Sequence, residues 1–413
     1  MWLKESPMDK LIGLLGIALI LGVAYLLSNN RKAINWRLVG IGTIFQLIIA
    51  LLILKVPGTR ELFALIGQGI NKLLDYAVDG AAFIVGDKLA RGEFIFLIRV
   101  GASIIFIAAL SSLAYYLGIL QFVVRKLARF LTRTMGVSGA EALSASSAIF
   151  VGQVECQVLI KPYMKTLTPS ELFCSITAAM GTISGSALVA YTAMGMNPTW
   201  LLAASIMAIP HGIVMAKMIW PETNKEAVAR QVELEVPKPG ANAFDAIAHG
   251  AMDGAKIAGN VMIMVLVAVA FVAMLNGGLG ALLSTFGVHW QIQDIMGFFM
   301  TPIAWLLGVP SHEAFHVGRL MATEIVVNEF VSYGELAKVI AGHGPYLLTL
   351  KTQLIATVAL CGFANLGSIA INIGGLGAMA PERRSEIAKM CLKALLAANM
   401  STWMSAAVAG LLF

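Results

Sequence analysis

Long apolar stretches alternate with short polar segments along almost the whole chain. Six of these stretches are uninterrupted and long enough to cross the roughly 30 Å hydrocarbon layer of a membrane as helices. They lie at about residues 11–28, 38–56, 94–117, 198–219, 257–280 and 386–412. This pattern predicts an all-α polytopic membrane protein.

Two further apolar stretches carry polar residues at membrane depth. Residues 138–170 are broken at Gly152 and hold Gln153 and Glu155, and residues 311–342 hold a cluster of polar groups. That cluster consists of Glu313, Arg319, Glu324, Asn328 and Glu329. A carboxylate in the bilayer costs at least about 2.5 kcal/mol on insertion scales, so such groups face a protein interior. Irregular backbone is tolerated there only where it lines a cavity, which predicts a re-entrant hairpin for each stretch.

Glycine interrupts two more apolar segments. Residues 170–196 are broken at Gly181–Gly185, and residues 346–373 are broken at Gly362–Ser368. Counting these two, we expect about eight transmembrane helices. Both halves of the chain then read span, interfacial helix, hairpin, broken helix, span, which predicts an inverted repeat. Paired interrupted segments of this kind indicate the midplane substrate site of a secondary transporter.

The remaining segments are amphipathic or polar. Residues 60–88 and 119–137 have the pattern of helices lying along the outer and the cytoplasmic interface, respectively. An apolar helix is expected at about 290–308, and residues 221–243 form a charged linker between the halves. The basic loop around Arg31 and Lys32 is expected in the cytoplasm, which places the N-terminus outside.

Composition supports a membrane location and excludes other classes. Hydrophobic residues make up 58% of the 413 residues and charged residues only 13%. The net charge of +6 lies mainly in short loops, and no basic stripe with aromatic residues predicts nucleic-acid binding. The four cysteines lie in apolar surroundings without a C-x-x-C pair, so we expect buried small side chains. His211, on an apolar span, is expected to be a hydrogen-bonded core residue.

One motif favours an enzyme. His312-Glu313-Ala314-Phe315-His316 is an H-E-x-x-H sequence, which on a helix places two zinc ligands on one face with a glutamate as general base. An intramembrane zinc metalloprotease is therefore an alternative, and Glu335 has a spacing that suits a third ligand. Against it, the chain has no hydrophilic catalytic domain. The other interpretation makes Glu313 a packing or ion-pair residue of the second hairpin.

Several short motifs, in order, resemble the concentrative nucleoside transporter family over nearly the whole chain. Gly152-Gln153-Val154-Glu155 is similar to the family's G-Q-x-E at the first hairpin tip, and Asn328-Glu329-Phe330 to its N-E-F at the second. Phe363-Ala364-Asn365 with Ser368-Ile369 is similar to its F-A-N-x-x-S-I. Smaller matches are Ser28–Lys32, Trp220–Thr223 and Gly308–Pro310.

The resemblance implies a bacterial inner-membrane, cation-coupled nucleoside importer that works by alternating access, without an organic cofactor or a structural metal. It implies a homotrimer whose protomers contain a scaffold (1–118 and 244–285) and a moving transport domain (119–220 and 286–413). The implied nucleobase contacts are Gln153, Val154 and Glu155, and the implied ribose contacts are Glu329, Asn365 and Ser368. Phe363, Ala187 and Ile369 would pack against the substrate.

The residue chemistry agrees with such a substrate. A neutral nucleoside carries many donors and acceptors, and each one left unpaired on burial costs about 1–3 kcal/mol. Carboxylates accept two hydrogen bonds from a diol, whereas amides both donate and accept. A structural alternative is that Glu155 and Glu329 merely pair with buried lysine or arginine.

The sequence departs from the family at the implied sodium site. That site would fall on Ala148, Val151, Thr182 and Ile183, and sodium-using members typically carry asparagine where Ala148 stands. Its loss removes one oxygen from a hard cation, although Thr182 keeps a hydroxyl. Coupling to Na⁺ and coupling to H⁺, carried by Glu155 or Glu329, both remain open.

Other departures concern selectivity and the second hairpin. Val154 replaces a usual threonine or serine, and Cys156-Gln157 stands where alanine or serine followed by proline is common. Arg319 and Glu324 replace residues that are usually serine and lysine. These two charges either invert a family ion pair or mark a transporter of the same fold with a divergent substrate. Purine or pyrimidine preference stays open.

Overall fold

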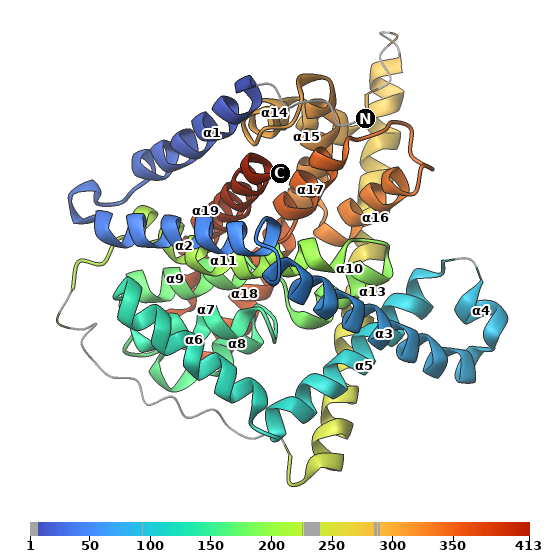
Figure 1. The fold of residues 1–413 in the computed structure, drawn as a ribbon, viewed down its shortest axis with the longest axis horizontal. Coiled ribbons are helices and arrows are strands. Elements are labelled where there is room, and N and C mark those ends of the chain that lie inside the picture. The colour runs from blue at the N-terminus through green and yellow to red at the C-terminus, as the bar shows by residue number, and fades with distance from the viewer. Residues whose placement is uncertain (1–6, 93, 225, 227–239, 285–286, 288–289) are drawn as a thin grey trace.

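The computed structural model describes residues 7–92, 94–224, 226, 240–284, 287 and 290–413, and in these ranges the chain forms helices without any strand (Figure 1). The first half contains α1 Pro7–Leu26, α2 Trp36–Leu54, α3 Thr59–Val85, α4 Asp87–Arg91, α5 Phe96–Tyr116, α6 Ile119–Met135, α7 Gly139–Ala148, α8 Glu155–Val158, α9 Pro169–Met180, α10 Gly185–Ala193 and α11 Pro198–Ile219. The second half contains α13 Ala243–Leu283, α14 Ile292–Leu306, α15 Ser311–Val326, α16 Glu329–Ile340, α17 Leu350–Ala359, α18 Leu366–Met379 and α19 Arg384–Leu412.

The all-α class is confirmed. Within the described ranges, six helical segments are long and apolar enough to cross a membrane, and one of them is the interrupted pair Pro169–Ala193. Shorter apolar helices lie at Leu11–Leu26, in the first expected span, and at Leu366–Met379, in the second interrupted helix. Both hairpins and both broken helices are present, as α7/α8, α15/α16, α9/α10 and α17/α18.

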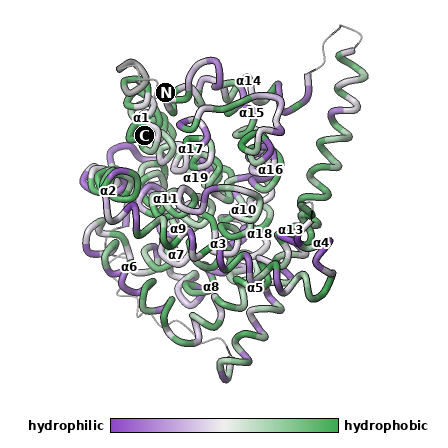
Figure 2. Tube along the Cα trace, turned by 45° about the vertical axis from the view of Figure 1, so that its right-hand side comes forward, coloured by the Kyte–Doolittle hydropathy of each residue, from purple (hydrophilic) through white to green (hydrophobic). Residues whose placement is uncertain are grey.

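Helix α13 is the longest element and begins earlier than the expected start at residue 257. Asn242 caps it by accepting a hydrogen bond from the Asp245 N–H at 2.9 Å, so the helix starts at Ala243. The predicted linker, 221–243, falls mostly outside the described residues. Only 6% of the most apolar 18-residue window of α13 is buried, and Figure 2 shows the upper part of this helix extending away from the rest of the molecule.

Small residues set the contact between α13 and α5. A Cβ added at Gly250 would lie 2.5 Å from Ser112 Cβ, and one at Gly254 would lie 2.8 Å from Ile105 Cα. The Ser112 hydroxyl also donates to the Ala246 carbonyl at 2.7 Å. This close packing of backbones through a G-x-x-x-G pair is how helices associate without a hydrophobic driving force.

The two interrupted helices meet in the centre of the molecule beside α19. The Phe363 N–H donates to the Thr182 carbonyl at 3.3 Å, so the breaks touch directly. From α19, the Asn399 amide donates to the Ala364 carbonyl at 2.9 Å. A Cβ at Gly181 would lie only 2.7 Å from Ser401 Oγ, which explains why this break contains glycine. Unwound backbone is thus satisfied by protein, as membrane depth requires.

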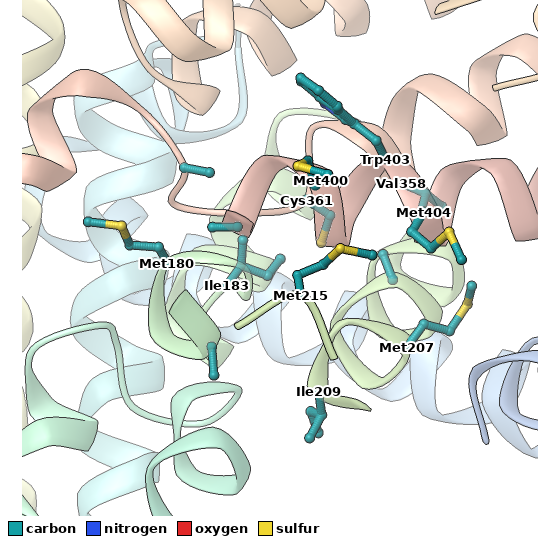
Figure 3. Close-up of a cluster of buried hydrophobic side chains, with 14 of the residues drawn as sticks. Met180, Ile183, Met207, Ile209, Met215, Val358, Cys361, Met400, Trp403 and Met404 are labelled. Carbon is teal, nitrogen blue, oxygen red and sulfur yellow. The ribbon is translucent and has the colours of Figure 1, made fainter. Parts of the chain in front are cut away.

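Methionines fill the core around these breaks. Met180 precedes the first break and Ile183 lies within it, while Met207, Met215, Met400 and Met404 come from α11 and α19 (Figure 3). Methionine is unbranched and polarizable, so it fills the irregular spaces that an interrupted helix leaves. His211 on α11 is fully buried, but neither ring nitrogen has a hydrogen-bond partner among the described residues. The expectation of a hydrogen-bonded histidine was therefore wrong.

The second arm of hairpin 1 and the end of the second break differ from the prediction. The second arm of hairpin 1 is only the four-residue α8 followed by a 3₁₀ turn at Lys161–Tyr163, which contains Pro162. Proline cannot donate its backbone nitrogen, so a continuous second arm is not formed. The second break ends at Asn365 rather than Ser368, because Asn365 caps α18 by accepting from the Ser368 N–H at 3.0 Å.

Candidate functional site

Glu329 lies at the tip of hairpin 2, in the first turn of α16. Asn328 caps this helix, accepting from the Val331 N–H at 3.0 Å, and Glu329 follows directly. The side chain is 4% exposed. Its carboxylate accepts from the Asn365 amide at 2.7 Å and from the Tyr191 hydroxyl at 3.0 Å. Both partners are neutral, so among the described residues Glu329 is held by donors and not by a lysine or arginine.

Gln153 lies at the tip of hairpin 1 and contacts the second broken helix. Its amide nitrogen donates to Ser368 Oγ at 3.1 Å, and its carbonyl oxygen accepts from the Asn372 amide at 3.0 Å. Asn372 also donates to the Ser368 carbonyl at 2.9 Å. The first hairpin is therefore joined to α18 by a bidentate amide contact.

These bonds form one continuous line of buried polar groups, which we name the polar chain. Its members in order are Tyr191, Glu329, Asn365, Ser368, Gln153 and Asn372. The polar chain links α10, both hairpin tips and α18. It brings together four residues singled out from the sequence, Gln153, Glu329, Asn365 and Ser368, on one connected surface.

The other two tip residues of hairpin 1 lie apart from the polar chain. The exposed Glu155 carboxylate folds back over Gly152, where an added Cβ would lie 2.3 Å from Glu155 Oε2. Gly152 has φ +130°, a conformation that favours glycine. Val154 packs against Gly375 of α18, where an added Cβ would lie 2.7 Å from its Cγ1. Within the described residues Glu155 has no ion pair either.

The expected packing residues surround the polar chain unevenly. Ala187, in the first turn of α10, is 5% exposed. Phe363, in the second break, and Ile369, in the first turn of α18, are both half-buried. Phe363 and Ile369 therefore offer apolar surface beside Asn365 and Ser368, whereas Ala187 is closed off.

The expected coupling-ion residues are mostly apolar. Ala148, Cys156 and Ala179 form a small buried cluster with Val151 packed against it. Thr182 and Ile183 are fully buried in the first break. The Thr182 hydroxyl donates to the Ala178 carbonyl at 3.2 Å, and its carbonyl accepts from Phe363. The Thr182 hydroxyl, the only side-chain oxygen of this group of four, therefore donates its hydrogen within α9 and keeps its oxygen lone pairs.

The H-E-x-x-H motif lies at the base of hairpin 2 and has a structural role. Glu313 accepts from the Thr349 N–H and from the Thr349 hydroxyl, both at 3.0 Å, at the N-terminus of α17. His316 stacks on Tyr346 with ring centroids 3.9 Å apart, while the side chain of His312 is 74% exposed. In the described part of the chain, no group of three or more histidine, cysteine, aspartate or glutamate residues could hold a metal ion.

Arg319 and Glu324 do not form an inverted ion pair. Arg319 lies 3.3 Å from Asp294 of α14 and donates to Gln291 at 3.1 Å. Glu324 is fully buried, and neither carboxylate oxygen has a hydrogen-bond partner in the ranges that the structure describes.

Sequence reasoning missed Tyr191 and Asn372 of the polar chain. Asn372 had a usable signal, because it follows Ser368 by four residues and so lies on the same face of the helix. Tyr191 had none, because its partner Glu329 is 138 residues away.

The chain matches family models along most of its length. Models described as Na⁺ dependent nucleoside transporter N-terminus and C-terminus match residues 15–88 and 200–410, and one described as nucleoside recognition matches residues 97–197. An uncharacterized transporter of Haemophilus influenzae is 40% identical over 98% of both chains. The nucleoside permease NupC of Helicobacter pylori is 36% identical, also over 98% of both.

A solved structure shares the fold. The structure of CNTnw in an inward-facing substrate-bound state is 38% identical, with a TM-score of 0.92 over 97% of this chain and 98% of that chain. These relatives are transporters and not enzymes, so the metalloprotease alternative was wrong. The chain belongs to the concentrative nucleoside transporter family.

Proposed function

We propose that this protein imports nucleosides across the bacterial plasma membrane by alternating access, driven by a cation gradient. The observation that carries the proposal is the polar chain, which joins both hairpin tips to both interrupted helices. A neutral, polar substrate needs many paired donors and acceptors when it leaves water. The polar chain offers carboxylate, amide and hydroxyl groups in one buried line.

The residues divide by chemistry. Glu329, Asn365 and Ser368 suit a ribose, because a carboxylate accepts from two hydroxyls while the amide and hydroxyl donate or accept. Gln153 and Glu155 suit the edge of a base, since Gln153 supplies both a donor and an acceptor. Phe363 and Ile369 offer apolar surface to the flat face of the base. Val154, which packs against Gly375, adds no polar selectivity at this edge.

The positions of the hairpins and interrupted helices also suggest which part of the protein moves during transport. We assign residues 119–220 and 286–413 to a transport domain, because they hold the hairpins and the interrupted helices. Residues 1–118 and 244–285 form the scaffold. The poorly covered apolar surface of α13 supports a homotrimer in which scaffold helices meet. The basic loop at Arg31 and Lys32 supports an outside N-terminus.

The coupling ion is Na⁺ or H⁺. The family models describe Na⁺ dependence. Ala148, however, offers no side-chain oxygen, which leaves the Thr182 hydroxyl as the only one among the four residues expected to bind the ion.

Uptake of labelled uridine into proteoliposomes tests the function. The purified protein is reconstituted and given an inward Na⁺ gradient, an inward H⁺ gradient, or only unlabelled uridine inside for exchange. We expect exchange when unlabelled uridine is inside, and accumulation with one of the two gradients. If no purine or pyrimidine nucleoside enters under any of the three conditions, the proposal is wrong. If only another solute class is taken up, the fold serves a divergent substrate.

A further inference from the structure

Glu324 is a buried carboxylate that neither the fold nor the proposed site uses. It lies near the end of α15, five residues before Glu329 at the hairpin tip. It is 0% exposed, and both carboxylate oxygens are without a hydrogen-bond partner among the described residues. By comparison, Glu329 on the same hairpin accepts two hydrogen bonds. Of these two carboxylates in hairpin 2, one is therefore hydrogen-bonded and the other is not.

The groups around Glu324 supply no positive charge. Glu329 and Tyr333 on α16 and Cys361 beyond α17 lie within electrostatic reach of it. The Tyr333 hydroxyl is engaged with the Thr357 carbonyl at 2.8 Å.

The nearest basic side chains in sequence act elsewhere. Arg319, on the same helix, pairs with Asp294 of α14. Lys338 of α16 forms no ion pair with Glu324. No described lysine, arginine or histidine neutralises Glu324.

Keeping the Glu324 carboxylate ionised in these surroundings is unfavourable in free energy. An uncompensated buried charge costs several kcal/mol, whereas a neutral acid avoids this cost. Glu329 beside it has two donors, which stabilise its ionised form and suit it to accept from a ribose. A second negative charge nearby would add repulsion. In this conformation the surroundings of Glu324 therefore favour its neutral, protonated form.

The expected sodium site at the first hairpin also favours a proton as the coupling ion. Of the four residues implied for sodium, Ala148 and Val151 lie in an apolar cluster, and only Thr182 carries a side-chain oxygen. Hard cations need several oxygen ligands. The place where Na⁺ would bind is poor in side-chain ligands, and hairpin 2 holds a carboxylate that suits a proton.

We propose that Glu324 is the proton-binding site that couples nucleoside import to the proton gradient. The carboxylate takes H⁺ from water on the outer side to give the neutral acid. It is carried in that form with the nucleoside, and the same proton returns to water on the cytoplasmic side. This proposal rests on the proposed function, since it assigns the coupling ion of that transport cycle.

Variants at Glu324 separate coupling from transport. In proteoliposomes with the membrane potential clamped at zero, an inward gradient of one pH unit drives wild-type uridine accumulation of about tenfold for one proton per nucleoside. Glu324→Gln mimics the neutral acid, so exchange should stay within about twofold of wild type while the accumulation ratio falls to about 1. Glu324→Asp should retain proton-driven accumulation. Glu335→Gln is the matched control on α16 and should accumulate like wild type.

Proton movement is measured directly with a pH-sensitive dye inside the vesicles. Wild type should acidify the interior when uridine is added outside, and Glu324→Gln should not. Size-exclusion profiles and retained exchange show that the variant is folded. Should Glu324→Gln still accumulate uridine with the proton gradient, or should wild type accumulate only with Na⁺, the assignment of Glu324 is wrong although nucleoside transport stands. Absence of exchange in wild type would instead overturn the proposed function.

Discussion

Each hairpin has an acidic side chain in the first turn of its first arm, but the two side chains have different partners. In hairpin 1, Glu141 accepts from the Ser138 N–H at 2.9 Å and forms an ion pair with Lys217 of α11. In hairpin 2, Glu313 bonds directly to Thr349, the cap of the following broken helix. One half therefore uses a buried cation, and the other half uses a direct hydrogen bond.

The caps of the broken helices explain this difference. Helix α9 has a complete capping box, in which Glu171 accepts from the Thr168 N–H at 2.7 Å. Helix α17 has Thr352 at the matching position, so the Thr349 N–H has no local carboxylate and takes Glu313 from the hairpin. In both halves the hairpin is therefore joined to the broken helix, but different residues form the contact in each half.

The ionic joint of the first half gives the largest expected effect. Lys217 is 7% exposed, donates to Ser170 at 2.9 Å and pairs with Glu141. Lys217→Met leaves a buried carboxylate without its cation, which costs about 3–5 kcal/mol. We expect a large drop in the thermal unfolding midpoint in detergent.

The matched double variant, Lys217→Met with Glu141→Gln, removes both charges and should recover most of the stability. If the single variant is as stable as wild type, the joint does not hold the first half together.

The tip of hairpin 2 should matter most for transport. Glu329→Ala removes an acceptor of two hydrogen bonds, and loss of about 3 kcal/mol of substrate binding corresponds to about a hundredfold lower uptake. The measurement is the initial rate of uridine uptake, with the unfolding midpoint as a check on folding. Glu335→Ala, on the same helix and outside the polar chain, should transport normally. Near-normal uptake by Glu329→Ala would contradict its role in ribose binding.

The direct joint of the second half gives a smaller effect. Glu313→Gln keeps one acceptor for Thr349 but weakens the charged hydrogen bonds, so we expect a loss of about 1–2 kcal/mol in unfolding free energy. The control, His312→Ala, removes an exposed imidazole that lies 3.6 Å from the Glu313 carboxylate, and it should change little. A drop in stability for His312→Ala equal to that for Glu313→Gln would show that the motif acts as a unit.

The smallest expected effect tests whether hairpin 1 depends on the second half for its orientation. Asn372→Ala removes the donor to the Gln153 carbonyl and frees that side chain. A single neutral hydrogen bond contributes about 1 kcal/mol, so the KM for uridine should rise about fivefold with kcat nearly unchanged. An unchanged KM would mean that Gln153 is positioned by Ser368 alone.

Most of the fold was readable from local pattern. The spans, both hairpins and both breaks were predicted because apolar length and glycine position act over a few residues. Errors fell at boundaries. The start of α13 and the end of the second break depend on asparagine caps at Asn242 and Asn365, which the sequence pattern did not indicate.

The candidate site was only partly readable. Gln153, Glu329, Asn365 and Ser368 were found by their resemblance to family motifs, and the structure joins them. Tyr191 was missed because its partner is 138 residues away in the chain, whereas Asn372 could have been found from its four-residue spacing to Ser368. The enzyme motif misled in the same way, because the partner that occupies Glu313 is Thr349, on another helix.

By itself, the sequence determined that this chain spans a membrane as interrupted helices, because hydrophobic length and helix-breaking glycine are local properties. Only the tertiary structure decided which buried polar groups are paired. Glu324 and Glu329 are identical in chemistry and five residues apart, yet one is left alone and the other accepts two hydrogen bonds. The difference lies in the neighbours that folding places around each carboxylate, and no local pattern encodes them.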